Sequence, residues 1–448
     1  MNHLAGFVSA QHVVDISVAD ALSILGNIVI VSGILGDNGQ AVINGDAHDV
    51  LVQSLALVHG VHLLGVSRNK QRQHAQVALH VLVGADQAEH VAFLQHIQQG
   101  IIGIHAQAAD AGAQLLGSLG TANDGNALGA EHAAQIGMCE EMQRDENVFM
   151  MGEDIAEYCG AFGVSRGMLE KFGKDRIMNT PISEQAYVGA GIGAAMAGMR
   201  PIVELMFSDF MCVCFDELVN EAPKMRFMFG GKVKVPMVMR TAAGAGTGAA
   251  AQHSQSLEAC LAHFPGLKVV IPSTPYDAKG LLKTAIRDDN PVMFLEQKTL
   301  YRTKGMVPEE EYTIPLGVAD VKREGTDCSI ITYGRMVQMS LQAAEKLAEE
   351  GIHVEVVDIR SLVPLDTKTI VESVKKTHRA LIVHEAVQFG GFGGEIAGQI
   401  ADSDAFYYLD APIRRLGALS CPIPFNPNLE RETFPTVDKI IAQVKSLL

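Results

Sequence analysis

The stretch Asn179-Thr180-Pro181-Ile182-Ser183-Glu184-Gln185 joins a strand-like run, residues 176–179, to a helix-like run rich in glycine and alanine. Ser183 is a typical N-cap residue, so Glu184 is predicted to lie in the first turn of the helix. Open α/β sheets place functional groups at this position, where a strand ends and the next helix begins. The helix dipole also favours an acid in the first turn without any catalytic role. The stretch alone therefore leaves two explanations of Glu184 open.

Strand and helix patterns alternate on both sides of this stretch, from residue 131 to about residue 300. Further strands are predicted at 148–151, 201–206, 235–240, 267–271 and 292–296. Helices are predicted at 133–144, 168–172, 211–228 and 252–264, and from Thr274-Pro275 to near Asp289; residues 208–210 and 241–251 are predicted loops. Such alternation is typical of a parallel sheet that helices cover on both faces.

A second alternating set follows a polar segment at 301–316, which contains two prolines. Strands are predicted at 329–332, 353–359, 380–384 and 413–416, and helices at 336–350, 366–376 and 437–448, with one more after the turn at 390–394. That glycine-rich turn lacks the phosphate-loop pattern and is interpreted as a tight connection. The predicted fold class is therefore α/β, with two parallel-sheet domains at 131–300 and 317–448 joined by a linker at 301–316.

Residues 1–130 differ in composition from the rest of the chain. They contain ten histidines but only one lysine, two arginines and one glutamate. His59 and His62 have helical spacing, but no carboxylate or cysteine completes a metal-binding set, so no metal site is predicted there. The leading hypothesis is that this segment is an unassigned extension, translated from an upstream start or in a wrong frame. A genuine but poorly ordered extension is the alternative.

The composition of the whole chain argues against several classes of protein. A net charge of −16 argues against a nucleic-acid-binding surface. No apolar run reaches about 18 residues, so no transmembrane helix is predicted. No basic segment precedes the most apolar early run, so no secretory signal is predicted either. Seven cysteines without a C-x-x-C pair favour buried thiols in a reduced compartment, and hence the cytoplasm.

Several longer motifs occur in order after residue 150. They are Gly152-Glu153-Asp154, Thr180 to Glu184, Gly193 to Gly198, Ala250 to Gln255, Asp277 to Lys283, Ala285 to Pro291 and Leu409 to Pro412. With these motifs, residues 131–448 resemble the β subunit of the thiamine-diphosphate-dependent E1 component of 2-oxo acid dehydrogenase complexes, a group that includes acetoin dehydrogenases. The resemblance implies a transketolase-like pyrimidine-binding domain followed by a transketolase C-terminal domain. The implied reaction is oxidative decarboxylation of pyruvate or a related 2-oxo acid.

The resemblance also implies roles for three side chains. Glu184 matches the glutamate that hydrogen-bonds N1′ of the aminopyrimidine, which favours the imino tautomer that removes the C2 proton of the thiazolium. Phe210 matches the aromatic residue that packs on the aminopyrimidine, and His253 matches a residue that faces the thiazolium and the substrate. A helix N-terminus favours ionised Glu184, whereas donation to N1′ needs a proton. Burial at a subunit interface is therefore expected to raise the pKa of Glu184.

Thiamine enzymes hold the diphosphate through a divalent metal at a Gly-Asp-Gly motif, which residues 131–448 lack. The resemblance assigns this Mg²⁺ site to a separate α subunit. An α₂β₂ heterotetramer is therefore expected, with the cofactor between subunits and acyl transfer to a lipoyl-bearing E2 core. The family's structural potassium site corresponds to backbone carbonyls of Met237, Ala285, Ile286, Asp288 and Asn290.

Three other interpretations are open. Acetoin is an alternative substrate, because Met206 to Phe210 and Ser273 to Asp277 are closer to the acetoin branch of the family. A non-catalytic assembly subunit is disfavoured by the presence of both Glu184 and His253. A Rossmann-type nucleotide-binding protein is disfavoured because no strand runs into G-x-G-x-x-G with a following acidic residue.

Overall fold

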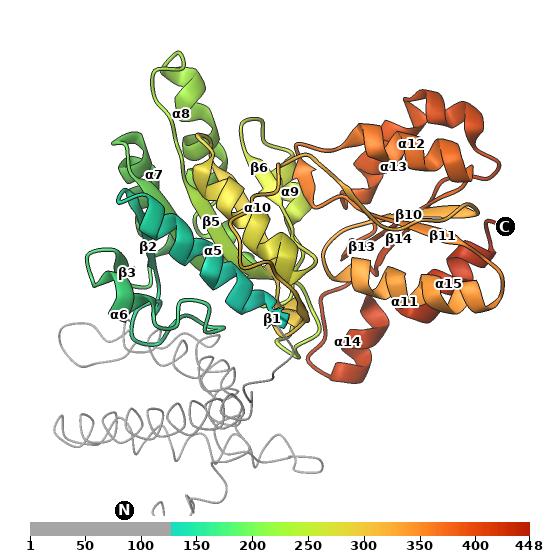
Figure 1. Ribbon diagram of the computed structural model, residues 1–448, viewed down its shortest axis with the longest axis horizontal. Coiled ribbons are helices and arrows are strands. Elements are labelled where there is room, and N and C mark those ends of the chain that lie inside the picture. The colour runs from blue at the N-terminus through green and yellow to red at the C-terminus, as the bar shows by residue number, and fades with distance from the viewer. Residues whose placement is uncertain (1–126) are drawn as a thin grey trace, which may run out of the picture. The chain divides into compact units, whose positions relative to one another are not determined.

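The computed structural model describes residues 127–448, and Figure 1 shows their strands and helices. The hypotheses about residues 1–126, including those on the histidines, lie outside the described residues. Residues 127–130, which the sequence analysis placed in the extension, form β1 (Ala127–Gly129) and the start of α5 (Ala130–Arg144). β1 pairs in antiparallel fashion with β8 (Lys304–Met306), which lies in the predicted linker. Both segments therefore belong to the described fold.

Seven strands form the first sheet, in the spatial order β12-β6-β7-β5-β4-β2-β3. Their bounds are β2 Val148–Gly152, β3 Ile177–Asn179, β4 Arg200–Phe207, β5 Val238–Ala243, β6 Lys268–Val270, β7 Val292–Gln297 and β12 Ser361–Val363. The strands run parallel, as predicted, except for β12, which pairs with β6 in antiparallel fashion. Because side chains alternate between faces, Met150 and Met151 enter two different buried cores.

Helices cover both faces of this sheet. Their bounds are α6 Met168–Phe172, α7 Glu184–Met196, α8 Ala222–Met228, α9 Glu258–Ala262 and α10 Pro275–Arg287. α5 and α10 pack side by side over one face (Figure 1), where Met138 and Leu281 join the same core. α7 covers the other face and buries Val188 and Ile192. This two-sided cover explains why the strands are mostly apolar, while the charged side chains of Glu204, Arg240 and Glu296 pair with one another inside the sheet.

Five strands form the second sheet, in the order β14-β13-β10-β11-β9. The elements of this part are β9 Asp320–Arg323, β10 Cys328–Thr332, β11 Val354–Asp358, β13 Ala380–Val387, β14 Arg414–Ala418, α11 Arg335–Glu349, α12 Thr367–Thr377, α13 Gly393–Ala401, α14 Pro427–Thr433 and α15 Val437–Lys445. α11 and α15 lie on one face, and α12 and α13 on the other (Figure 1). The polar edge strand β9 was not predicted, and it pairs with β11 in antiparallel fashion.

The helix predicted at 211–228 is helical only over 215–228 and includes a π-helical turn, and the loop predicted at 208–210 was wrong. Residues Ser208–Cys212 form a 3₁₀ helix, η1, and Glu217–Glu221 form a π-helical turn, η2, that leads into α8. Pro223 explains the interruption, because proline has no N–H and its ring crowds the carbonyl four residues earlier. A π-helical turn just before Pro223 accommodates that crowding.

The predicted helix at 252–264 is also shorter than expected and is limited to α9. The backbone before α9 forms a hydrogen bond outside the helix instead, because the carbonyl of Gln255 accepts from the N–H of Gly244 at 3.1 Å. The strand predicted at 235–240 begins only at Val238, after Pro236, which cannot donate to a ladder.

Among the helices of residues 127–448, none combines the length and the apolar character that crossing a membrane requires. All seven cysteines of the chain lie in this range, and all are free thiols.

Candidate active site

The side chains predicted to carry chemistry follow neighbouring strands of the first sheet. Because β3, β2, β4 and β5 are adjacent and parallel, their carboxyl ends meet at one edge. Glu184 begins α7 after β3, Phe210 lies in η1 after β4, and His253 lies in the irregular segment after β5. The topology therefore brings all three predicted residues to the edge where open α/β sheets place their sites.

Glu184 stands beside a second acid, Glu153, which directly follows β2 and is 7 % exposed. Burial, and then the negative charge of Glu184, raises the pKa of Glu153 to about 7. One carboxyl oxygen of Glu153 and the hydroxyl of Tyr187, in the first turn of α7, lie against each other and form no other hydrogen bond among the described residues. Buried polar atoms are nearly always paired. Beyond their mutual contact, both groups keep hydrogen-bonding capacity that a ligand or a partner could use.

The start of α7 lacks the predicted capping hydrogen bond. Ser183 occupies the N-cap position, as predicted, but its side chain accepts no hydrogen bond from the helix. Glu184 itself is half-buried, and Ile182 beside it is 81 % exposed. The predicted burial of Glu184 would thus need a surface that the described chain does not supply.

Three aromatic rings cluster on the β4 and β5 side of this edge. The ring centroids of Phe207 and His253 are 4.9 Å apart, and those of Phe210 and His253 are 5.3 Å apart. Phe207 and Phe210 meet edge to face at 6.0 Å. All three rings are partly exposed, so each keeps some surface free for a ligand. The predicted pair of Phe210 and His253 is thus brought together by the fold.

The predicted potassium ligands lie around the carboxyl end of α10. The carbonyls of Ile286 and Asp288 each accept a hydrogen bond from Nη1 of Arg200 at 3.0 Å. The carbonyl of Met237 accepts from a strand N–H at 2.9 Å, and that of Ala285 accepts a helix-end N–H at 3.2 Å. These carbonyls converge partly on a guanidinium, and only their second lone pairs are left for an ion.

Asn290 completes the predicted potassium set. Its backbone N–H and its side-chain amide both donate to the Asp288 carboxylate, at 2.9 and 2.8 Å. These bonds order the turn after α10. No cluster of three or more His, Cys, Asp or Glu side chains suited to a metal ion occurs within residues 127–448. The potassium site stays a prediction.

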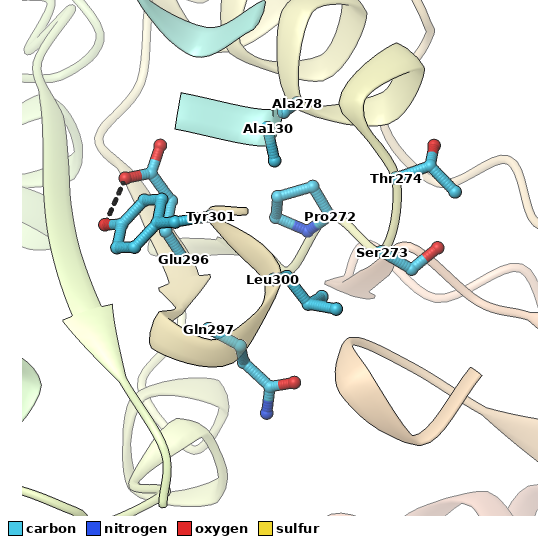
Figure 2. Close-up of a pocket in the computed structure, with 9 residues that line it drawn as sticks. All are labelled: Ala130, Pro272, Ser273, Thr274, Ala278, Glu296, Gln297, Leu300 and Tyr301. Carbon is cyan, nitrogen blue, oxygen red and sulfur yellow. Dashed lines mark hydrogen bonds between the residues drawn. The ribbon is translucent and has the colours of Figure 1, made fainter. Parts of the chain in front are cut away.

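A small cavity lies near the start of α5 and is lined by residues of β7, η3 (Lys298–Leu300) and the segment before α10 (Figure 2). Its volume of about 20 Å³ is close to the space that one water molecule needs. On its wall, Tyr301 donates to Glu296 at 2.8 Å, and Glu296 also pairs with the buried Arg240. The cavity is too small to bind a substrate.

Sequence reasoning missed three residues of this region. Glu153 stood in a quoted motif, directly after a predicted strand, which could have marked it as a second acid at the sheet edge. Phe207 lies three residues before Phe210, but only the fold brings its ring to His253. Lys298 is 5 % exposed and donates to the carbonyl of His253. No local pattern could have predicted that contact between residues so far apart in sequence.

Comparisons with known proteins identify both domains of the fold. Residues 126–304 match the transketolase pyrimidine-binding domain, and residues 317–440 match the transketolase C-terminal domain. A split-gene transketolase, solved as an inactive β4 tetramer, superposes with a TM-score of 0.59 at 22 % identity, covering 72 % of this chain and 98 % of that one. This likeness concerns the fold alone.

Closer relatives share about half of their residues with the chain. The β subunit of an acetoin:2,6-dichlorophenolindophenol oxidoreductase from Bacillus subtilis is 49 % identical over 319 residues, which cover 68 % of this chain and 93 % of the relative. The pyruvate dehydrogenase E1 component subunit β of Rickettsia felis is 48 % identical, with 70 % and 96 % covered. The 2-oxoisovalerate dehydrogenase subunit β of Bacillus subtilis is 46 % identical, with 70 % and 97 % covered.

Proposed function

The chain belongs to the family of E1 β subunits of 2-oxo acid and acetoin dehydrogenases, and we propose that it supplies the pyrimidine half of a thiamine-diphosphate site shared with an α subunit. The proposed reaction is decarboxylation of pyruvate or a related 2-oxo acid, followed by acyl transfer to a lipoyl-bearing E2. The observation that carries the proposal is one sheet edge with a helix-start acid, Glu184, and an aromatic face, Phe210.

The residues present fit an aminopyrimidine. Such a ring is flat and aromatic, and it carries a ring nitrogen that can share a proton with a carboxyl group. Phe210 would pack on its face, and Glu184 would bind the ring nitrogen N1′. The carboxyl group of Glu153 and the hydroxyl of Tyr187, which contact each other, lie close to Glu184 and supply further polar partners. The donor set is therefore suited to a polar heteroaromatic ring rather than to an apolar one.

When bound, thiamine diphosphate supplies a carbon acid whose conjugate base adds to a carbonyl group. Glu184 holds a proton at N1′ and so tunes the proton transfer that activates this carbon. Glu153, with its raised pKa, places a second titrating carboxyl beside Glu184 near neutral pH. His253, between the rings of Phe207 and Phe210, is proposed to handle protons on the substrate side.

The other half of the site is assigned to the α subunit. Residues 131–448 lack the Gly-Asp-Gly motif that binds the divalent metal, so we assign Mg²⁺ and the diphosphate to the partner. Exposed apolar side chains occur on the segments that lead to this sheet edge, namely Tyr158 after β2, Met178 on β3 and Ile182 before α7. Covering them in an α₂β₂ assembly would remove apolar surface from water and bury Glu184 more deeply. Free thiols throughout agree with a reduced compartment such as the cytoplasm.

Acetoin is the second candidate substrate. The stretch Met206 to Phe210 resembles the acetoin branch, and within it Phe207 contacts His253 on the proposed substrate side. The names of the three relatives give different substrates, but their sequence identities to the chain are similar. Identity alone therefore does not choose between them.

The test is reconstitution with the cognate α subunit, thiamine diphosphate and Mg²⁺. Reduction of the dye 2,6-dichlorophenolindophenol is followed with pyruvate, 2-oxoisovalerate or acetoin as the only substrate. We expect turnover of at least one of them, dependent on both subunits. An assembled heterotetramer that turns over none of the three would contradict the proposal.

A further inference from the structure

The segment that carries His253, residues 244–257, is irregular and is tied at its ends. Its first backbone N–H donates to the carbonyl of Gln255 at 3.1 Å, and Gln255 donates twice to Asp209, at 3.1 and 2.9 Å. Between these ties, Ala250 has a φ of 61°, in the left-handed region. That conformation is unfavourable for a non-glycine residue, because it brings the Cβ atom too close to the following carbonyl oxygen. Strained backbone of this kind persists only where its neighbours fix it.

Side chains from the second part of the chain hold the first half of this segment. Glu385 on β13 accepts from the N–H of Ala245 at 2.5 Å, and Arg335 on α11 donates to the carbonyl of the same residue at 3.1 Å. Glu430 on α14 accepts from the N–H of Gly246 at 2.7 Å. The backbone before Ala250 is therefore fixed by three buried charged groups.

The second half of the segment is held at His253 itself. Lys298 follows β7 at the start of η3, and its ammonium donates to the carbonyl of His253. The same ammonium lies 5.4 Å from the ring centroid of Phe207. One buried cation therefore contacts both the backbone of His253 and the ring against which the imidazole packs.

Lys298 is a buried lysine whose direct contacts carry no charge, although charged groups lie near it. Its ammonium contacts a neutral carbonyl and an aromatic ring, and burying a charge in such surroundings is costly. Burial lowers the pKa of Lys298, while the charges of Asp209, Glu385 and Glu430 raise it and that of Arg335 lowers it. These four groups come from η1, β13, α14 and α11, so Lys298 stands inside a charged cluster that links the His253 segment to the second sheet.

We propose that Lys298 is a positioning residue for His253: by holding the His253 carbonyl and the Phe207 ring, it fixes where the imidazole lies. This inference rests on the function proposed above, in which His253 acts on the substrate side. Lys298 is not proposed to contact the cofactor or the substrate. Its loss should therefore affect the steps that need His253 and spare the proton transfer that needs Glu184.

The test uses the heterotetramer with Lys298→Met, which keeps the length of the side chain and removes the cation. We expect kcat to fall about 10- to 100-fold, the scale for a misplaced catalytic group. Deuterium exchange at C2 of the bound cofactor should stay within about threefold of wild type, because it depends on Glu184. Lys283→Met is the matched control, since Lys283 is also a buried lysine but lies on α10, paired with Glu140. It should leave both rates within about twofold of wild type.

A double-mutant cycle decides whether Lys298 acts through His253. In the His253→Ala background, Lys298→Met should cost less than about twofold in kcat, because the group that it positions is gone. An equal cost in both backgrounds, or a parallel loss of kcat and C2 exchange, would overturn the proposal.

A readout that does not depend on activity completes the test. Hydrogen–deuterium exchange of the backbone amides at 249–256, measured by mass spectrometry, should speed up in Lys298→Met and not in Lys283→Met. Unchanged amide exchange in Lys298→Met would mean that the contact between Lys298 and the His253 carbonyl does not hold the segment. A wild-type heterotetramer without turnover would refute the proposed function instead, and amide exchange would still decide whether Lys298 fixes the segment.

Discussion

Glu184→Gln separates a catalytic acid from a first-turn acid that only serves the helix. Glutamine keeps the shape of the side chain and can still contact N1′, but it cannot transfer a proton there. Positioned proton transfer contributes about 10²–10⁴-fold. At about 1.4 kcal/mol per tenfold, the barrier to C2 deprotonation should rise by roughly 3–5 kcal/mol.

The structure predicts a much smaller effect of the same change on stability. An acid in a first helical turn contributes about 0.3–1 kcal/mol through the helix dipole. Glu184 also repels Glu153, whose pKa it raises, so its neutralisation relieves part of that repulsion. The two effects oppose each other, and the free energy of unfolding should change by less than about 1 kcal/mol. The pKa of Glu153 should fall below its present value of about 7.

The assay is deuterium exchange at C2 of the bound cofactor in the reconstituted heterotetramer, stopped by acid and read by NMR. Glu170→Gln is the control, because Glu170 is an exposed first-turn acid of α6, a helix outside the site. The control should exchange at the wild-type rate. If Glu184→Gln also exchanged at a near-wild-type rate, the assignment of Glu184 as the N1′ partner would have to be abandoned.

Three further predictions concern the rest of the chain. Burial and then the charge of Asp277 raise the pKa of Asp358 to about 7, so the folded state binds this proton more tightly than the unfolded state. The free energy of unfolding that this proton contributes is complete below the usual pKa of about 4 and is lost as the pH rises through about 7. The melting temperature of the wild type minus that of Asp358→Asn should therefore decrease over this pH range. A difference that stays constant would contradict the raised pKa of Asp358. Deleting residues 1–126 should leave assembly with the α subunit intact in gel filtration, whereas a heterotetramer that forms only with the full chain would refute this. If the carbonyls around α10 bind potassium, this ion should raise the melting temperature more than sodium does at equal ionic strength. Equal melting temperatures in the two salts would contradict a potassium site there.

Local chemistry made some elements predictable. Thr274 and Pro275 predicted the start of α10, and the Thr274 side chain does accept from the N–H of Asp277 at 3.1 Å. The acid of Glu184 was placed at the first residue of α7 from its neighbours alone. Both predictions depended on residue types within four positions of the helix start, which a sequence displays directly, although the cap expected from Ser183 does not form.

Long-range contacts explain what was missed. In the chain, β12 follows strands of the second sheet, but it pairs with β6 of the first sheet. No local pattern predicts that partner. The first part of the helix expected at 252–264 is irregular, because Gln255 binds Asp209 and the N–H of Gly244 directly after β5. Lys298 and His253 are 45 residues apart in the sequence, so no local pattern predicts their contact. Glu184, Phe210 and His253 were thus accessible from motifs, whereas Glu153, Phe207 and Lys298, which surround them, were missed.

The central claim is that this chain holds only the pyrimidine half of the cofactor site. Isothermal titration of thiamine diphosphate with Mg²⁺ into the chain alone, the α subunit alone and their heterotetramer tests it most directly. We predict tight binding by the heterotetramer and weak or undetectable binding by either subunit alone. Micromolar binding by this chain without the α subunit would contradict the claim.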